Sequence, residues 1–380
     1  MRLFYLKTNI FMHNSFSLGK VKNIEIKIHY SWFLIFFLIT WSLARFYFPA
    51  QYPGLGGFFY WFYSLIAAVL LFASVLFHEM AHSLVGRKNH VIVKSITLFV
   101  FGGVAEMLTE PERPDEEFKM AVAGPVASFV LAGAFFVISI AGAGLAISAI
   151  AHYLFLINSI LVVFNLVPAF PLDGGRIFRS ILWVKYKNLD RATRYAVWVS
   201  RICALVLTLW GIKMLLENNF ISGLWMILIS WFLLQAAGAS LKQSLMEHVL
   251  SPIKVTEIME TNFRSISPKM PLHELAKAFL TYKQGGFPVV EDGRIFGIVT
   301  LEDLRTIPQE RWEKTIVKKV MTDAEKLHFL KPKDNAFDAF LKLTNNDLGR
   351  LPVVENGEVV GMVTRNSIIL LLAVKCDKSI

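Results

Sequence analysis

LFASVLFHEMAHSLVG, at Leu71–Gly86, places three ionisable side chains in an otherwise apolar segment. On a helix, residues four apart lie on one face, so His78 and His82 can present two imidazoles to one zinc ion, with Glu79 beside the metal's water. Such a motif can arise by chance, and a histidine on an apolar helix is often a satisfied core residue. Within a bilayer-length segment, however, ionisable residues are costly and mark functional sites. The spacing therefore predicts a zinc site in a membrane-spanning helix.

The composition indicates that much of the chain lies in lipid. Hydrophobic residues make up 55% of the sequence and charged residues only 18%, whereas about 25% are charged in soluble proteins. The net charge is +10, but most of the excess lies beside hydrophobic segments, where it orients a membrane protein, so we expect no nucleic-acid partner. The two cysteines, Cys203 and Cys376, imply neither a disulfide framework nor a cysteine zinc site. Histidine and carboxylate must therefore supply the ligands.

Apolar runs long enough to cross a lipid bilayer predict about six transmembrane helices. They lie at Tyr30–Pro49, Phe59–Gly86, Phe118–Leu145, Ile147–Pro168, Ala196–Leu216 and Ile221–Leu241. The connections 50–57 and 141–147 carry no Lys or Arg, while 86–94 and 174–194 are rich in both, and basic loops stay in the cytoplasm. Met1–His29 is basic and lacks the cleavage pattern of a secretory signal. We therefore expect a multi-pass protein of the cell membrane, with both termini cytoplasmic and the zinc within the bilayer near its cytoplasmic side.

The segment Val91–Met107 is short, rich in β-branched residues and interrupted by Gly102-Gly103. It predicts one or two strands or a re-entrant hairpin close to the site, because non-helical backbone at membrane depth must be satisfied by protein or water. An unpaired strand edge there could capture an extended peptide through backbone hydrogen bonds. A hairpin that serves only packing is the alternative.

A second informative stretch, Asn158–Arg176, ends a helix with Pro168 and Pro171 and then reads Leu-Asp173-Gly-Gly. Asp173 thus lies at a broken helix end, near the expected depth of His82. A catalytic zinc has three protein ligands and one open position, which makes Asp173 the expected third ligand. In isolation, an acid that caps an interfacial loop would explain this residue better.

These motifs together resemble the site-2 protease family of intramembrane zinc metalloproteases, peptidase family M50. The resemblance covers approximately Asn14 to Leu241 and rests on His78-Glu79-x-x-His82, Gly102-Gly103, Ala123-Gly124-Pro125 and Asn165-Leu-x-Pro168-x-x-Pro171-Leu-Asp173-Gly174-Gly175-Arg176. Close helix packing alone would explain the Ala-Gly-Pro motif and the nearby Ser128.

The resemblance implies a zinc metalloendopeptidase with one Zn²⁺ per chain. The ion would be held by His78, His82 and Asp173, with Glu79 as the catalytic base and acid. Asn165 would lie near the scissile carbonyl, although an asparagine in a helix bundle is also commonly interhelical glue. The substrate would be a membrane protein, cleaved within or near a transmembrane segment.

After Gln243 the composition becomes that of a soluble protein, and an internal repeat follows. Gly286-Phe-Pro288-Val-Val-Glu-Asp-Gly293 is matched 64 residues later by Arg350-Leu-Pro352-Val-Val-Glu-Asn-Gly357. Each copy predicts a strand, an Asx-Gly hairpin, a second strand and a helix that starts at a Thr. The repeat resembles a tandem pair of CBS domains. The expected fold is a polytopic α-helical membrane domain at 1–245 plus cytosolic α/β CBS domains at 251–310 and 315–375.

The CBS resemblance implies a regulatory adenine nucleotide, ATP or AMP, between the two copies. In that family a Thr-x-x-Asp element holds the ribose and phosphate, and Thr300 and Asp303 match it fully. The second copy keeps Thr364 but has Ser367 in place of the acid, so we expect one nucleotide site rather than two. A plain helix N-cap would also explain both threonines. A homodimer of this chain, formed through the CBS domains, is a further expectation.

Two other classes of function compete with the protease hypothesis. A CBS-regulated transporter or channel could use the same metal site, but a transport site has no need of Glu79, and these helices contain almost no other charge to line a pathway. A non-catalytic nucleotide-sensing scaffold would not need intact metal ligands. Zinc content and the cleavage of a membrane peptide would separate the three classes.

Overall fold

The computed structural model describes residues 15–100, 102–107, 111–142, 144–345 and 348–376. The chain divides into two units, Met1–Ser244 and Leu245–Ile380. We call them the helical unit and the C-terminal unit.

Over the described residues, six helical segments are long and apolar enough to cross a membrane. They are Ser31–Gln51 (α2, a π-helical turn and α3), Gly57–Lys88 (α4), Pro114–Ile140 (α5), Leu145–Asn165 (α6), Leu189–Leu216 (α8) and Phe220–Leu250 (α9). They confirm the six predicted spans. The first span contains α2 (Ser31–Ser42) and α3 (Phe48–Gln51), which the π-helical turn Leu43–Tyr47 joins. A shorter helix, α7 (Asp173–Tyr186), follows α6 in the chain.

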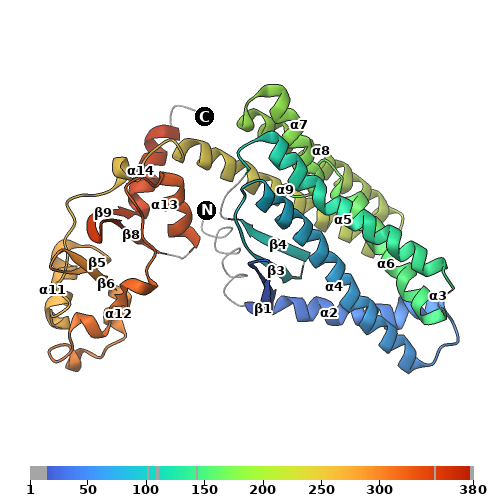
Figure 1. The fold of residues 1–380 in the computed structure, drawn as a ribbon, viewed down its shortest axis with the longest axis horizontal. Helices are drawn as coiled ribbons and strands as arrows, with labels where there is room; N and C mark the ends of the chain where they lie inside the picture. The colour runs from blue at the N-terminus through green and yellow to red at the C-terminus, as the bar shows by residue number, and fades with distance from the viewer. Residues whose placement is uncertain (1–14, 101, 108–110, 143, 346–347, 377–380) are drawn as a thin grey trace. The chain divides into compact units, whose positions relative to one another are not determined.

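Helices α4, α5 and α6 run side by side in Figure 1. Small residues are buried along them, including Ala67 of α4, Ala132 of α5 and Ala149 of α6. Lipid is as apolar as leucine, so burial of apolar area does not drive these helices together, and small side chains allow the close approach that packing requires. Large apolar side chains such as Phe129 and Val130 remain exposed, as expected of lipid-facing positions.

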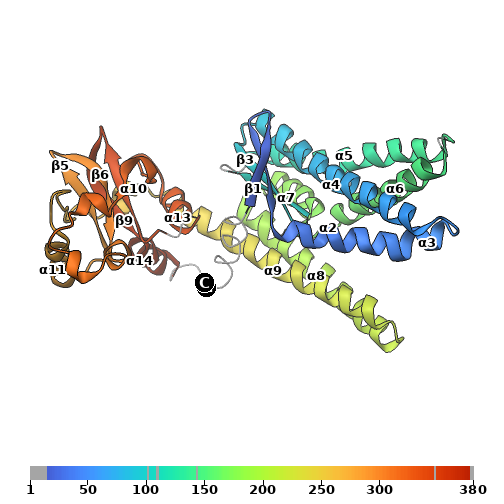
Figure 2. The same ribbon diagram turned by 90° about the horizontal axis from the view of Figure 1, so that it is seen from below.

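A four-stranded sheet lies at one end of the helical unit, opposite to α3 (Figure 2). Its order is β1 (Ser15–Val21), β2 (Ile24–His29), β3 (Val93–Phe99) and β4 (Gly102–Met107). Strands β3 and β4 form an antiparallel hairpin, which confirms the prediction for Val91–Met107. Strand β4 is an edge strand, paired on one side only among the described strands.

Strands β1 and β2 were not expected from the sequence. They form a hairpin whose turn residues, Lys22 and Asn23, have φ of 47° and 63°, as a tight two-residue turn requires. The signal was the alternation of Ile24, Ile26 and Ile28, all buried, with charged residues. Strand β2 then pairs with β3 in parallel. This contact joins segments far apart in the chain, so no local sequence pattern predicts it.

The C-terminal unit contains a five-stranded sheet in which β5, β6, β9 and β8 follow one another and β7 pairs with β6. The strands are β5 (Gly286–Glu291), β6 (Arg294–Thr300), β7 (Thr322–Asp323), β8 (Arg350–Glu355) and β9 (Glu358–Thr364). The helices are α10 (Val255–Ile258), α11 (Leu272–Tyr282), α12 (Leu301–Arg305), α13 (Ala336–Asn345) and α14 (Arg365–Cys376).

Both predicted Asx-Gly hairpins are confirmed in this unit. Asp292 and Gly293 have φ of 51° and 78°, and Asn356 and Gly357 have φ of 53° and 88°. Two consecutive positive φ angles are the signature of the turn that joins tightly paired strands. Each repeat has its own apolar core, one around Leu275 and Phe287, the other around Leu343 and Leu351.

Candidate metal centre and ligand pocket

The two histidines of α4 face each other inside the helical unit. His78 and His82 are 6% and 5% exposed, and their Nε2 atoms lie 3.1 Å apart. The four-residue spacing places both rings on one face of the helix, as the sequence predicted.

Asp173 begins α7 and completes a cluster of three buried groups. Its Oδ2 lies 3.1 Å from the Nε2 of both His78 and His82. Gly174 allows this approach, because a Cβ there would overlap the backbone carbonyls of Leu166 and Val167. The sharp break after α6 therefore positions the acid.

Helix α5 backs the cluster with three residues spaced four apart. The His82 Nδ1–H donates to the Met120 carbonyl at 2.7 Å, and the His78 Nδ1 lies 2.9 Å from the Ser128 hydroxyl. Between them, a Cβ on Gly124 would overlap the Nε2 atoms of both histidines. Sequence reasoning explained Gly124 and Ser128 by helix packing and missed this role, although the spacing 120-124-128 was the available signal.

The donor set fits a zinc ion. Because the Nδ1 of His82 donates to a carbonyl, the Nε2 of the neutral imidazole that a metal requires is an acceptor, and it faces a second acceptor, the Asp173 carboxylate. A cation between them relieves that repulsion. Zinc bonds of about 2.0–2.1 Å in a tetrahedron place ligand atoms about 3.3 Å apart, close to the 3.1 Å that separates these atoms.

Glu79 lies beside the cluster without belonging to it. The metal-type group found among the described residues contains His78, His82 and Asp173 only. Edge strand β4 passes close to Glu79, since a Cβ on Gly103 would lie 2.5 Å from the Glu79 Cγ. Glu79 therefore lies next to the three-residue cluster and near the edge of β4 that no described strand pairs.

Asn165 is the last residue of α6 and is half-buried. No side-chain hydrogen bond of its amide occurs within the described part of the chain, so the structure does not join it to the histidines. A different asparagine, Asn158, is fully buried and donates to the Leu154 carbonyl at 2.8 Å and to Ser74 of α4 at 3.4 Å. It therefore ties α6 to the helix that carries the histidines.

A buried ion pair holds α7 against α5. The Arg179 Nε donates to the Glu117 carboxylate at 2.7 Å, and both side chains are buried. Charges out of water persist only when they are paired. The pair thus fastens the helix that presents Asp173 to the helix that backs both histidines, a role that sequence reasoning missed because it treated the charges of 174–194 as topology signals.

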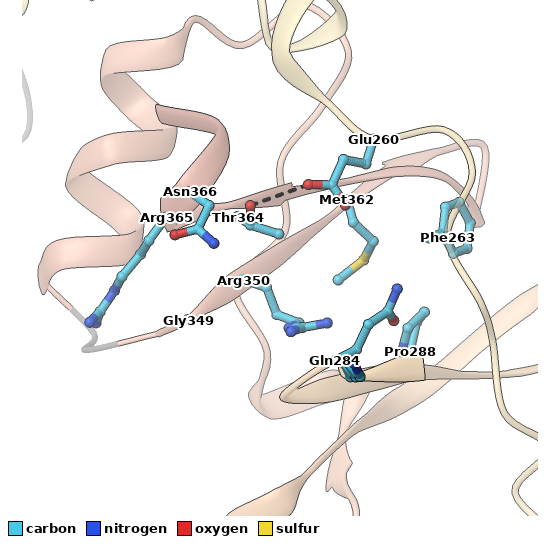
Figure 3. A pocket seen from close by; sticks show the side chains of 11 residues that line it. Glu260, Phe263, Gln284, Pro288, Gly349, Arg350, Met362, Thr364, Arg365 and Asn366 are labelled. Carbon is cyan, nitrogen blue, oxygen red and sulfur yellow. Dashed lines mark hydrogen bonds between the residues drawn. The ribbon is translucent and has the colours of Figure 1, made fainter. Parts of the chain in front are cut away.

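In the C-terminal unit, Thr300 and Asp303 form a capping box. The Asp303 Oδ2 accepts from the Thr300 N–H and hydroxyl, both at 2.8 Å. Thr364 instead lines a cavity of about 260 Å³ between the two repeats (Figure 3), whose lining does not include Thr300 or Asp303. The cavity therefore includes the threonine of the second copy and not that of the first. The nucleotide site expected at Thr300 and Asp303 stays a prediction.

Comparison with known proteins identifies both units. The model of peptidase family M50 matches residues 66–147 and 140–208, and the model of the CBS domain matches 255–310 and 317–374. A protein of Synechocystis sp., provisionally named zinc metalloprotease sll0528, is 33% identical over 95% of this chain and 96% of its own length. Zinc metalloprotease MJ0392 of Methanocaldococcus jannaschii is 30% identical over 96% of this chain and 97% of its own.

A solved structure of the site-2 protease from Methanocaldococcus jannaschii is 30% identical, with a TM-score of 0.40, and covers 59% of this chain and 94% of that one. The near full-length relatives set aside the transporter and scaffold hypotheses, because they share the protease and CBS parts in one chain. The chain thus belongs to peptidase family M50, as a multi-pass zinc metalloprotease of the site-2 protease type that carries a pair of CBS domains.

Proposed function

We propose that this metalloprotease cleaves membrane proteins within or near their transmembrane segments. The observation that carries the proposal is the burial of the His78, His82 and Asp173 cluster among helices long enough to span a bilayer. A substrate bond must reach that depth to be cut.

Each residue of the site has a proposed role. His78, His82 and Asp173 would hold the zinc, which would supply polarisation of a carbonyl and a lowered pKa for a bound water. Glu79 takes a proton from the attacking water and returns it to the leaving amine, as one carboxylate commonly does in both directions. Asn165 donates an amide hydrogen bond to the carbonyl oxygen as negative charge develops on it.

The edge of β4 is the proposed binding site for an extended substrate. A transmembrane helix protects its own peptide bonds through internal hydrogen bonds, so a segment must unwind before a carbonyl is accessible. The edge of β4 that no described strand pairs offers replacement hydrogen bonds for the unwound backbone. Gly103 supports this role, since its missing side chain leaves the strand in close contact with Glu79.

We expect cleavage of a single-span substrate reconstituted with the protein in liposomes. Mass spectrometry should place the cut within the apolar segment or within a few residues of its end. A zinc chelator should abolish cleavage and added Zn²⁺ should restore it, because the ligands contribute no nucleophile of their own. Cleavage restricted to soluble, unfolded peptides would contradict the intramembrane proposal.

The proposed orientation places both termini and the CBS domains in the cytoplasm of a cell-membrane protein. The support is the distribution of Lys and Arg, which are absent from connections 50–57 and 141–147 and frequent in 86–94 and 174–194. The metal centre would then lie toward the cytoplasmic side of the bilayer. A homodimer through the CBS domains stays a prediction.

We also propose that adenine nucleotide binds the CBS pair and changes the rate of proteolysis. CBS domains commonly bind adenine nucleotides, and the cavity at Thr364 offers a place for one. The Thr300–Asp303 element is the alternative place, but α12, which follows it, has only five residues. A short helix concentrates little positive potential at its start, whereas α14, after Thr364, has twelve residues.

We expect AMP or ATP to change the cleavage rate of the full-length protein by about 5- to 150-fold, the range of usual coupling energies. A ligand can shift the active state only by its difference in affinity for the two states, which bounds the effect. Steady-state cleavage measured with and without nucleotide, at fixed zinc, tests this. Normal nucleotide binding with an unchanged rate would reduce the CBS pair to a tether.

A further inference from the structure

The two CBS repeats carry their acids in different places. In the first repeat the acid is Asp303 of α12, and Thr322 of β7 pairs with Ile298 of β6. In the second repeat the corresponding helix residue is Ser367, and the segment that pairs with β9 contributes Glu260.

Glu260 and Thr322 occupy equivalent positions. Glu260 exchanges two backbone hydrogen bonds with Met362, at 2.8 and 3.0 Å, just as Thr322 pairs with Ile298 in the first repeat. The preceding residues, Met259 and Met321, both pack against a glycine of the neighbouring strand. The acid that the helix of the second repeat lacks is therefore present on the strand-like segment beside it.

The Glu260 carboxylate faces the Thr364-x-x-Ser367 element, which has a serine where the first repeat has an acid. Its Oε1 lies 3.4 Å from the Thr364 hydroxyl and 3.4 Å from the Ser367 hydroxyl, which are themselves 2.8 Å apart. Figure 3 shows the carboxylate at the rim of the cavity, directed toward Thr364. A carboxylate accepts two hydrogen bonds at once, so it suits the paired hydroxyls of a ribose.

Arg350 supplies a cation to the same cavity. Its guanidinium donates to the Gly286 carbonyl, the equivalent position of the first repeat, and burial lowers the pKa of the guanidinium from its ordinary value. No carboxylate of the described residues forms an ion pair with it. The neighbouring Arg365 is directed away from the cavity in Figure 3 and donates to the Leu348 carbonyl. Arg350 is thus the guanidinium that an entering anion would meet.

The rest of the lining is mixed, with Lys283, Gln284 and Asn366 as its polar members and an apolar part beside them. Phe263, Met362 and Pro288 line the cavity, and an aromatic ring with a thioether suits the flat face of a purine. A volume of about 260 Å³ is just below the usual range of small-molecule sites, about 300 to 1,000 Å³, and suits a small ligand such as a mononucleotide.

We infer that Glu260 is the ribose-binding carboxylate of the second repeat and Arg350 its phosphate-binding cation, so that this cavity takes a purine ribonucleoside monophosphate. The inference rests on the proposed nucleotide regulation. It assigns the specificity of the site to a residue outside the Thr-x-x-Asp element.

Calorimetry on the purified full-length protein in detergent tests the assignment with AMP, 2′-deoxy-AMP and adenosine. Hydrogen bonds to a charged group contribute about 1.5–3 kcal/mol, so the wild type should bind AMP about tenfold or more tighter than 2′-deoxy-AMP. Glu260→Gln should remove most of that preference while 2′-deoxy-AMP still binds. Arg350→Ala should weaken AMP but leave adenosine nearly unchanged. Asp303→Asn, the matched change in the first repeat, should leave the ratio as it is.

The outcomes separate the inference from the proposal beneath it. If the wild type binds no AMP, nucleotide regulation through this cavity is wrong and the inference goes with it. If AMP binds and Asp303→Asn, not Glu260→Gln, removes the preference, the ribose lies at the first repeat. If Glu260→Gln weakens AMP and 2′-deoxy-AMP equally, Glu260 only supports the structure and the assignment is overturned.

Discussion

Glu79→Gln should abolish peptide cleavage while the protein keeps its zinc. General acid and base catalysis contributes about 10²- to 10⁴-fold to rates, and here one carboxylate is expected to perform both steps. The side chain lies outside the ligand cluster of His78, His82 and Asp173, so the amide should not disturb the metal. Cleavage of a single-span peptide and zinc content by mass spectrometry, on the same preparation, measure the two halves.

A matched control is Glu217→Gln, the same chemical change on a side chain that is 60% exposed at the end of α8. It should leave both cleavage and zinc unaltered. Cleavage near the wild-type rate in Glu79→Gln would remove Glu79 from the reaction. Loss of zinc together with activity would instead make Glu79 part of the metal site, contrary to its position beside the cluster.

Asp173→Ala should remove the metal itself. The carboxylate contacts both histidine nitrogens at 3.1 Å, and without it two ligands remain where a catalytic zinc requires three. Changes around metal ligands already weaken binding by about 10- to 100-fold, so the loss of a ligand should exceed that range. Zinc titration against a competing chelator gives the affinity, and cleavage should fall in parallel.

Asp115→Ala is the matched control, because it also removes an aspartate from the first turn of a helix in the same unit. Its carboxylate is 40% exposed and pairs with Lys119 at the surface, an interaction worth about 0–1 kcal/mol. Zinc binding should be unchanged in this variant. Full zinc occupancy in folded Asp173→Ala protein would mean that the third ligand is another residue.

Many structural features of this protein can be predicted from short stretches of its sequence. The spacing of His78 and His82 follows from helix geometry, the six spans follow from runs of apolar residues, and the two hairpins of the C-terminal unit follow from Asp292-Gly293 and Asn356-Gly357. In each case the deciding interactions lie within a few residues of one another, so the local pattern contains the physical cause. The zinc-ligand hypothesis combined two such patterns, the His78/His82 pair and the Asp173 segment. It joined them because both are expected at a similar depth in the membrane.

The tertiary structure alone decided which distant segments meet. The parallel pairing of β2 with β3, the fit of Gly124 against both histidines, and the burial of Glu117 with Arg179 depend on contacts far apart in the chain. The same holds for Glu260, which the sequence assigns to the first CBS domain at 251–310 and the fold places at Thr364 of the second. The residues around a glycine or a glutamate in the sequence do not indicate which distant residue it will contact, because that contact is set by the packing of whole helices and strands.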